Sequence, residues 1–393
     1  MSCSSSRVVH APGRWSVLAV VCWLGGTGCI RELEPDLAAP TPWEIQPAPS
    51  IDDGTSYWPG TQWRTALPAQ VQMDSAAMAT LSRDLRGNRW PTMRSLLIVR
   101  RGYLVLNEYL DDATPQTIQP LETATTTVTG LLVGVAEREG KLGMASGIPQ
   151  LFPEYADLLS LGGKNGLVVD NLLTMRSGLD FYEEDSFNPS VAGLTRSAGD
   201  WLRYVFSAPQ RAPPGERWNY SSGDAVALGG VLHAVTGESA SAYARHALFT
   251  PLGIADYTWS TGQPDALPQM GGGLSLTAPD MARLGYLLLR QGRWGAAPIV
   301  TPAWVASMSE RRSIGVAEWL GYKLDFGRML WELPPIPGTE DLGVVAAAGF
   351  GGQWIIVVPS RDLVVVATGD AASVENHART LQLLYDVILP AAR

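Results

Sequence analysis

The residues best suited to chemistry lie in one threonine-rich turn that runs into an apolar segment, Pro120 to Gly134. Apolar side chains recur there at three- and four-residue spacing, which predicts a buried helix that ends near Gly140. Backbone N–H groups at a helix start have no partner within the helix and favour developing negative charge. The turn is therefore a candidate site for chemistry. Its hydroxyl groups belong to Thr123, Thr125, Thr126 and Thr127.

This segment resembles one in the serine β-lactamase, penicillin-binding protein and carboxylesterase superfamily, most closely in the 6-aminohexanoate-dimer hydrolase-like branch. There it reads roughly Pro-Leu-x-Ser-Ala-Thr-Lys-Ser-Val-Thr-x-Leu-Leu-Val-Gly. Thr123 stands where the family has its nucleophilic serine, and Thr126 stands where it has its lysine. Both members of the Ser-x-x-Lys pair are therefore replaced by threonine.

The resemblance extends over most of residues 57 to 393 through four further segments in the family's order. Two of them carry site residues: one is similar to the Tyr-x-Asn or Tyr-x-Ser motif, and one to the glycine-rich entry of the third motif strand. Each segment is weak alone, but five in the same order make the resemblance specific. The four are Val168–Leu179, Pro214–Asp224, Gly271–Gly285 and Ala348–Gln353.

The resemblance implies an acyl-transfer site. In such a site a hydroxyl attacks a carbonyl, a Lys/Tyr pair moves its proton, and two backbone N–H groups hold the oxyanion. Tyr220 takes the proton-shuttle position and Ser222 the hydrogen-bonding position beside it. The N–H of Thr123 and one N–H from the glycine-rich turn would form the oxyanion hole. The implied substrate-binding residues of that turn are Gly351, Gly352 and Gln353.

What this sequence lacks is a group that activates the nucleophile. A tyrosine phenol has a pKa of about 10 unless a neighbouring cation lowers it, and Thr126 carries no charge. The methyl group of Thr123 also restricts its χ1 angle and crowds the attack path. Two functions stay open: a degenerate envelope protein whose cleft binds a small amide, ester or peptide-like ligand, and a weak amide or ester hydrolase that uses Thr123 with Tyr220.

Structural roles are the alternative for several of these residues. Thr125 and Thr127 are expected to be helix-capping hydroxyls, and Tyr220 could be a hydrogen-bonded phenol of the core. The glycines of the third motif could mark only a bulge at a strand entrance. No histidine pair has the spacing of metal ligands, so neither a metal nor another cofactor is expected. The histidines considered are His233, His246 and His377.

The N-terminal segment indicates export. Residues 1–29 contain two arginines, no acidic residue and an apolar run before small residues and Cys29, which is typical of a signal peptide. Cys29 imperfectly resembles a lipoprotein cysteine, so a lipid anchor there is an open alternative. Residues 30–56 read as a Pro-rich tether, which leaves 57–393 as the β-lactamase-like domain. We expect a periplasmic or extracellular protein.

Charge also bears on the partners. The chain has a net charge of −9 at pH 7, and its lysines and arginines form no cluster in the sequence. Nucleic acid is therefore not an expected partner.

The remaining pattern predicts an α+β fold. A helix capped by Asp74 precedes a β-hairpin formed by 95–99 and 103–109, and a second hairpin formed by 353–358 and 363–367 precedes a terminal helix. Strands at both chain ends with helices between them indicate an antiparallel sheet built from both termini, flanked by helices and interrupted by a helical insertion.

Overall fold

The computed structural model describes residues 58–392 apart from 61, 182, 184–192, 195–198, 262–266, 320–321, 334, 336–340 and 371–374. These residues belong to the second of two compact units, Glu44–Arg393, the first being Met1–Trp43. The predicted export signal, Cys29 and the predicted tether lie outside the described residues. Among the residues described, no helix is long and apolar enough to cross a bilayer.

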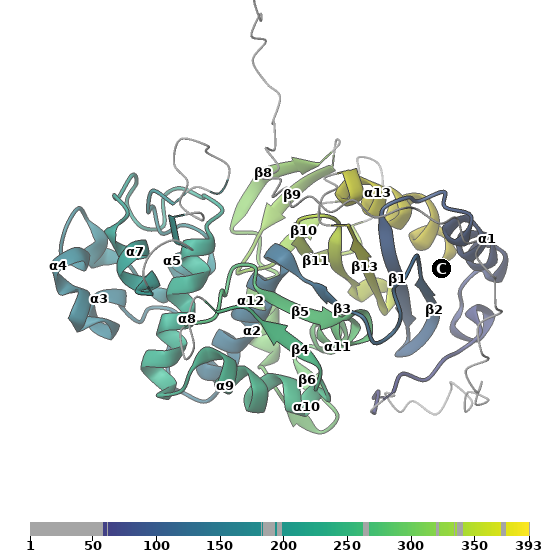
Figure 1. Ribbon diagram of the computed structural model, residues 1–393, viewed down its shortest axis with the longest axis horizontal. Helices are drawn as coiled ribbons and strands as arrows, with labels where there is room; N and C mark the ends of the chain where they lie inside the picture. Colours follow the sequence, from purple (N-terminus) through teal and green to yellow (C-terminus); the bar gives the residue numbers. More distant parts are fainter. Residues whose placement is uncertain are drawn as a thin grey trace, which may run out of the picture. The chain divides into compact units, whose positions relative to one another are not determined.

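An eight-stranded antiparallel sheet forms the centre of this unit (Figure 1), in the order β2-β1-β13-β12-β11-β10-β9-β8. β1 and β13 come from opposite ends of the chain and pair with Leu96 opposite Ala367. The predicted sheet from both termini is thereby confirmed, as are both hairpins. The strands are β1 (Met93–Arg100), β2 (Tyr103–Tyr109), β8 (Ser313–Trp319), β9 (Tyr322–Phe326), β10 (Trp331–Leu333), β11 (Val344–Gly349), β12 (Gln353–Val358) and β13 (Leu363–Gly369).

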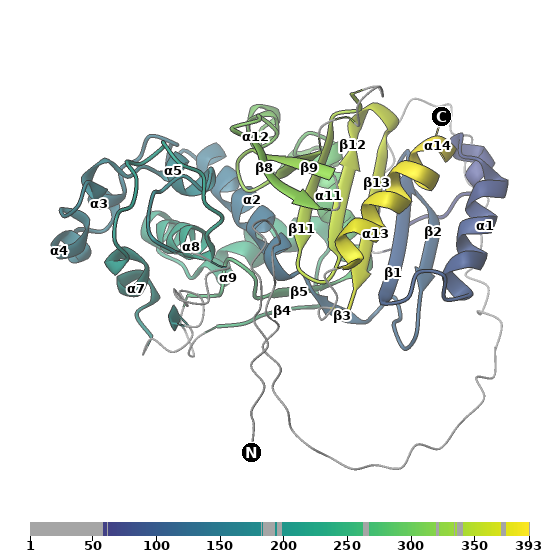
Figure 2. The same ribbon diagram turned by 90° about the horizontal axis from the view of Figure 1, so that it is seen from above.

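Helices cover both faces of the sheet, which explains why its central strands are apolar without alternation. Gly285 of α11 lies against Ile355 and Val364, whereas His377 of α13 contacts the Trp354 ring at a centroid distance of 5.5 Å. Successive residues of a strand point to opposite faces, so α11 and α13 pack on opposite sides, as Figure 2 shows. The helices that flank the sheet are α1 (Ser75–Arg86), α11 (Ala278–Leu289), α13 (Glu375–Leu383) and α14 (Leu389–Ala391).

The predicted terminal helix is present but irregular, because a π-helical turn, Leu384–Ile388, separates α13 from α14. The predicted first helix is confirmed as α1, and the Asp74 carboxylate accepts the N–H groups of Ala76 and Ala77 at distances of 2.8 and 3.0 Å. Asp74 therefore caps this helix as its sequence position indicated.

The helical insertion lies between β3 and β8 and is organised around α8, whose residues from Ser222 to Leu232 are all buried. Two short sheets, β3-β5-β4 and β6-β7, accompany it. Its elements are α2 (Thr125–Arg138), α3 (Ile148–Leu151), α4 (Ala156–Leu159), α5 (Val169–Leu173), α7 (Trp201–Ser207), α8 (Ser222–Thr236), α9 (Ala240–Ala244), α10 (Thr250–Leu252), α12 (Pro302–Met308), β3 (Ile118–Pro120), β4 (Tyr257–Trp259), β5 (Leu274–Thr277), β6 (Arg293–Trp294) and β7 (Ala297–Pro298).

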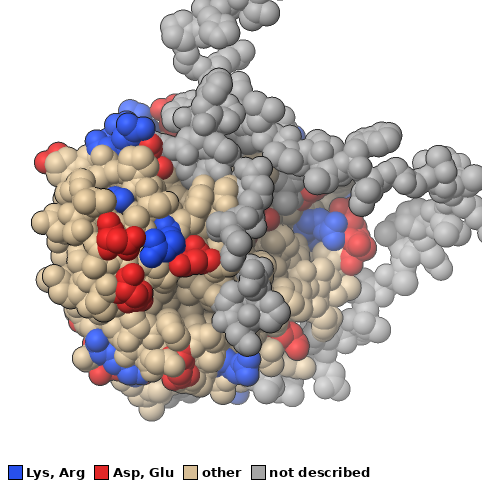
Figure 3. Space-filling view, turned by 60° about the vertical axis from the view of Figure 1, so that its left-hand side comes forward, with Lys and Arg blue, Asp and Glu red and all other residues tan. Residues whose placement is uncertain are grey.

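The outer surface of this insertion carries charges of both signs. On the face seen in Figure 3, acidic and basic residues are interspersed among uncharged ones. Arg203 of α7, for example, forms an exposed ion pair with Asp157 of α4 at 3.0 Å. Such surface pairs contribute little to stability, so this region depends mainly on its apolar core.

Helix α2 joins the sheet to the insertion, and its small residues allow close packing. A Cβ atom on Gly134 would lie 2.3 Å from the Trp304 indole nitrogen, so a larger residue does not fit there. The same indole N–H donates a hydrogen bond to the Gly130 carbonyl at 3.2 Å. Trp304 of α12 is 2% exposed and therefore holds α2 in place by both volume and hydrogen bonding.

Replacing this side chain tests that role. Trp304→Ala is expected to lower the free energy of unfolding by about 3–5 kcal/mol, because it leaves a cavity against α2 and removes one hydrogen bond. Urea unfolding followed by far-UV circular dichroism measures the change. Ile314→Ala is the control: this side chain is 79% exposed, so its loss should change stability by less than about 0.5 kcal/mol.

Candidate active site

Thr123 lies in a short 3₁₀ turn, η2 (Glu122–Ala124), immediately before the first residue of α2. Its hydroxyl donates to the Ala348 carbonyl of β11 at 3.2 Å. The preceding residue, Glu122, has a φ of 49°, a left-handed conformation that is uncommon for residues other than glycine. Thr123 is thus presented by a tight, strained turn at the junction of the sheet and α2.

Three predicted site residues come together around this turn. The Thr126 hydroxyl donates to the Thr123 carbonyl at 2.9 Å, and the Tyr220 hydroxyl lies 3.4 Å from that same oxygen as a long hydrogen bond. The three side chains come from η2, α2 and the segment before α8. They form a cluster of neutral hydroxyl groups.

The other threonines of α2 bind neighbouring segments. The Thr127 hydroxyl donates to the Met329 carbonyl at 2.7 Å, and the Thr125 hydroxyl accepts the Leu274 N–H at 3.4 Å. No side chain caps the start of α2. Thr125 and Thr127 do lie in the first turn of α2, as expected, but the expectation that they cap it is wrong, because their hydroxyls reach segments that are distant in the sequence.

Tyr220 is supported by an aromatic cluster. Its ring stacks on Trp331 with a centroid distance of 6.0 Å and an interplanar angle of 8°. Phe326 and Trp218 contact it at an angle, at 6.3 and 6.4 Å. Aromatic packing of this kind fixes ring orientation, so the phenol is held beside Thr123 from several sides.

Ser222 is buried at the start of α8, directly after the segment that carries Tyr220. Its backbone N–H donates to the carboxylate of Glu183. Its side chain faces Gly271, where an added Cβ would come within 2.7 Å of the Ser222 hydroxyl oxygen. Ser222 is therefore close in sequence to Tyr220, while its side chain packs against Gly271.

The glycine-rich turn joins β11 to β12. Gly351 and Gly352 have φ values of 80° and 89°, which favour glycine. Gln353 begins β12, and its side-chain amide donates to the Gly369 carbonyl at 2.9 Å. The end of β11 packs closely on the turn that carries Thr123: a Cβ on Gly349 would lie 2.0 Å from the Leu121 carbonyl. The roles of Gly351, Gly352 and Gln353 in substrate binding stay predictions.

Comparison with known proteins identifies the family of this chain. The family model described as Beta-lactamase matches residues 54–383. The chain belongs to the Beta-lactamase family. Within it, the chain is similar to the 6-aminohexanoate-dimer hydrolase of Paenarthrobacter ureafaciens, with 27% identity over 317 residues, 77% of this chain and 79% of that protein. It is also 27% identical to Protein flp of Staphylococcus aureus (strain COL) over 200 residues, 48% of this chain and 38% of that protein.

Solved structures share the fold. The octameric penicillin-binding protein homologue from Pyrococcus abyssi superposes with a TM-score of 0.61 at 18% identity, covering 80% of this chain and 78% of that one. EstCE1, described as a hydrolase with promiscuous acyltransferase activity, superposes with a TM-score of 0.64 at 20% identity, covering 77% and 95%. The predicted α+β, penicillin-binding-protein-like fold of this family is thereby confirmed.

The electrostatics of the site differ from those of a Lys/Tyr pair. Burial raises the pKa of the Tyr220 phenol above its ordinary value, and the nearby Glu183 carboxylate raises it further, while hydrogen bonds with Thr126 and Thr123 lower it. Burial is the largest of these effects. The phenol is therefore protonated at neutral pH, and Thr126 supplies no positive charge to reverse this.

Two acidic residues of this site were given no role from the sequence. Glu183 follows Leu179 by four positions, and Asp224 lies within the Tyr220 motif itself. Asp224 is fully buried, and neither of its carboxylate oxygens has a hydrogen bond of good geometry among the described residues. Burial raises the pKa of Asp224 from 3.8 to about 8, although the Ser177 and Ser221 hydroxyls lie close enough to oppose the shift.

Most of the polar segment 180–188 lies outside the described residues. A cavity of about 640 Å³ lies elsewhere, lined by residues such as Arg245, Ile254 and Tyr257. It contains none of the predicted site residues. Among the described residues, no group of three histidine, cysteine or acidic side chains could hold a metal ion.

The raised pKa of Asp224 predicts a pH dependence of stability. Because the folded state holds the proton more tightly than the unfolded state, it binds more protons between about pH 4 and pH 8, and stability falls as pH rises through this window. Asp224→Asn should remove this fall of stability with rising pH. At pH 8.5 the variant should be more stable than the parent by at least about 1.4 kcal/mol, the equivalent of one pKa unit.

Urea unfolding at pH 4.5 and pH 8.5 measures this difference. Asp111→Asn, at an exposed position after β2, is the matched control and should leave this fall of stability unchanged. An unaltered pH dependence in Asp224→Asn would show that this carboxyl group is ionised in the folded protein at neutral pH.

Proposed function

We propose that this chain is a catalytically degenerate member of the Beta-lactamase family that binds a small amide, ester or peptide-like ligand in its inherited cleft. The observation that supports the proposal is the cluster of Thr123, Thr126 and Tyr220, in which three neutral hydroxyls meet. A site built for acyl transfer needs a base beside the nucleophile. Here the position of the family's lysine carries a hydroxyl that donates to a backbone carbonyl.

The direction of the Thr123 hydroxyl also supports the absence of turnover. Its proton points to the Ala348 carbonyl, and a carbonyl oxygen cannot take up that proton as a base. Loss of a positioned proton-transfer group costs about two to four powers of ten in rate. Catalytic groups that act as a unit lose their effect together, so Tyr220 alone is not expected to restore activity.

A weak hydrolase is the second candidate. Thr123 keeps a partly exposed hydroxyl at the N-terminal end of α2, where backbone N–H groups favour an oxyanion. Rotation of the Thr123 side chain would release its hydrogen bond to Ala348. This candidate requires a covalent adduct on Thr123, whereas reversible ligand binding requires none.

Mass spectrometry and kinetics separate the two candidates. The wild-type protein should bind a fluorescent penicillin reversibly, show no mass increase after long incubation with a fluorophosphonate probe, and not hydrolyse a small chromogenic ester. Thr123→Ser combined with Thr126→Lys should gain esterase activity, because it restores both the nucleophile and its activating cation. Activity should rise at least about a hundredfold over wild type.

The same double variant with Tyr220→Phe is the control and should lose most of the gained activity. A wild-type adduct located at Thr123 would overturn the degenerate assignment in favour of the hydrolase. A well-folded double variant without activity, together with no detectable penicillin binding by wild type, would show that the cleft itself has been lost.

We also propose that the protein is exported and anchored through Cys29. The support is the acid-free, apolar N-terminal pattern of residues 1–29 and the Pro-rich segment 30–56. When the full chain is expressed in a bacterium, it should sediment with membranes and incorporate radiolabelled palmitate, and Cys29→Ser should abolish the labelling. Cys22→Ser is the control, because its cysteine lies within the apolar run. Equal labelling of both variants would contradict an anchor at Cys29.

A further inference from the structure

The turn between β9 and β10, residues 327–330, joins the two strand ends whose aromatic rings contact Tyr220. Phe326 ends β9 and Trp331 begins β10, and the two residues are directly opposite in the antiparallel register. Their rings lie 4.9 Å apart, and both contact the Tyr220 ring. A displacement of this turn would therefore move two of the rings that hold the phenol.

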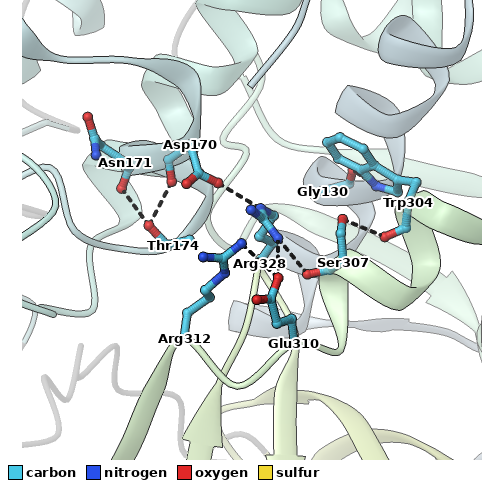
Figure 4. A network of polar contacts seen from close by, with 9 residues as sticks. All are labelled: Gly130, Asp170, Asn171, Thr174, Trp304, Ser307, Glu310, Arg312 and Arg328. Atoms are coloured by element: carbon cyan, nitrogen blue, oxygen red, sulfur yellow. Dashed lines mark hydrogen bonds and ion pairs between the residues drawn. The ribbon is translucent and has the colours of Figure 1, made fainter. Parts of the chain in front are cut away.

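Arg328 connects this turn to two helices (Figure 4). Its Nε donates to the Asp170 carboxylate of α5 at 2.7 Å, and its Nη1 donates to the Ser307 carbonyl of α12 at 2.9 Å. Nη1 also lies 3.4 Å from the Glu310 carboxylate, which pairs with Arg312 at 2.7 Å. Arg328 is only 4% exposed, and its charge is balanced by these acids.

The backbone of the turn is held by the same neighbours. The Arg328 N–H donates to the Met308 carbonyl at 3.1 Å, and the Met329 N–H donates to the Leu173 carbonyl at 2.9 Å. Met329 has a φ of 54°, so its backbone is in a conformation that needs support from its surroundings. The Met329 carbonyl accepts the Thr127 hydroxyl of α2, which links the turn to the helix that begins at the candidate site.

We propose that Arg328 is a positioning residue for ligand binding at the Thr123–Tyr220 site. It fixes the 327–330 turn between α5 and α12. The position of this turn then sets how Phe326 and Trp331 pack against Tyr220. A planar guanidinium can donate along several directions at once, which a lysine ammonium on a flexible chain does not reproduce. The proposal rests on the proposed function only in naming ligand binding as the property that is affected.

The exposure of the two carboxylates that contact Arg328 distinguishes a positioning role from a general role in stability. Asp170 has a side chain that is 32% exposed and Glu310 one that is 54% exposed, so water can solvate both carboxylates if the guanidinium is removed. Removing Arg328 would then mainly allow the 327–330 turn to move, and it would not leave an unpaired charge buried. That movement should act on the site through Trp331 and Phe326.

A double-mutant cycle tests this coupling. The variants are Arg328→Met, Trp331→Leu and their combination, with Arg328→Lys as the milder substitution should the first not fold. Each is compared with wild type for the dissociation constant of a fluorescent penicillin and for the near-UV circular dichroism of the aromatic residues. Urea unfolding confirms that each sample is folded under the assay conditions.

Arg328→Met should weaken penicillin binding by about tenfold, the equivalent of about 1.4 kcal/mol, and should change the near-UV spectrum. Adding it to Trp331→Leu should cause little further loss, since both changes act through the same ring. The matched control is Arg89→Met, which removes an exposed guanidinium from its ion pair with Asp84 and should change neither measurement.

Fully additive losses, or unchanged affinity and spectrum in a folded Arg328→Met protein, would overturn the positioning role. If the wild-type protein does not bind the penicillin at all, the proposed function fails for this class of ligand. The spectra still decide the role of Arg328 in that case: coupled changes support it, and additive or absent changes refute it.

Discussion

The close contact between the start of α2 and the end of β11 is the constraint on which the candidate site depends. Gly349 leaves no room for a side chain because the Leu121 carbonyl occupies that space, and Ala348 accepts the Thr123 hydroxyl. At this point the sheet built from both chain ends meets the helical insertion. Any shift between the two parts would separate Thr123 from the strand and from Tyr220. The geometry of the site therefore depends directly on how the sheet and the insertion pack.

The interior around this contact is held together by hydrogen bonds between neutral groups. The threonines of α2 bind the segments that carry Met329 and Leu274, and the Trp304 indole N–H donates to the Gly130 carbonyl of the same helix. Neutral groups of this kind avoid the desolvation cost of a buried ion pair. Where its relatives are expected to hold a lysine, this chain has a threonine that is satisfied by its own helix turn. The fold is therefore compatible with a neutral residue at this position.

Much of the fold could be predicted from local patterns. The Asp74 cap, the two hairpins and the apolar face of α2 each follow from neighbouring residues, because capping, turn chemistry and periodicity act over a few positions. The site was predictable only in part. Thr123, Thr126 and Tyr220 could be identified by resemblance, whereas Glu183, Asp224 and Arg328 could not, since their importance comes from burial and from partners far along the chain.

The sequence by itself determined that the chain has the α+β fold of its family, and it predicted that threonines stand at the two positions of the Ser-x-x-Lys pair, since residue identity and local periodicity are properties of the chain alone. Only the tertiary structure decided what those hydroxyls do. Thr123 faces β11, Thr127 binds the β9–β10 turn, and burial rather than a neighbouring cation sets the pKa of Tyr220. The physical reason is that hydrogen-bond partners and desolvation depend on which distant segments are packed around a group.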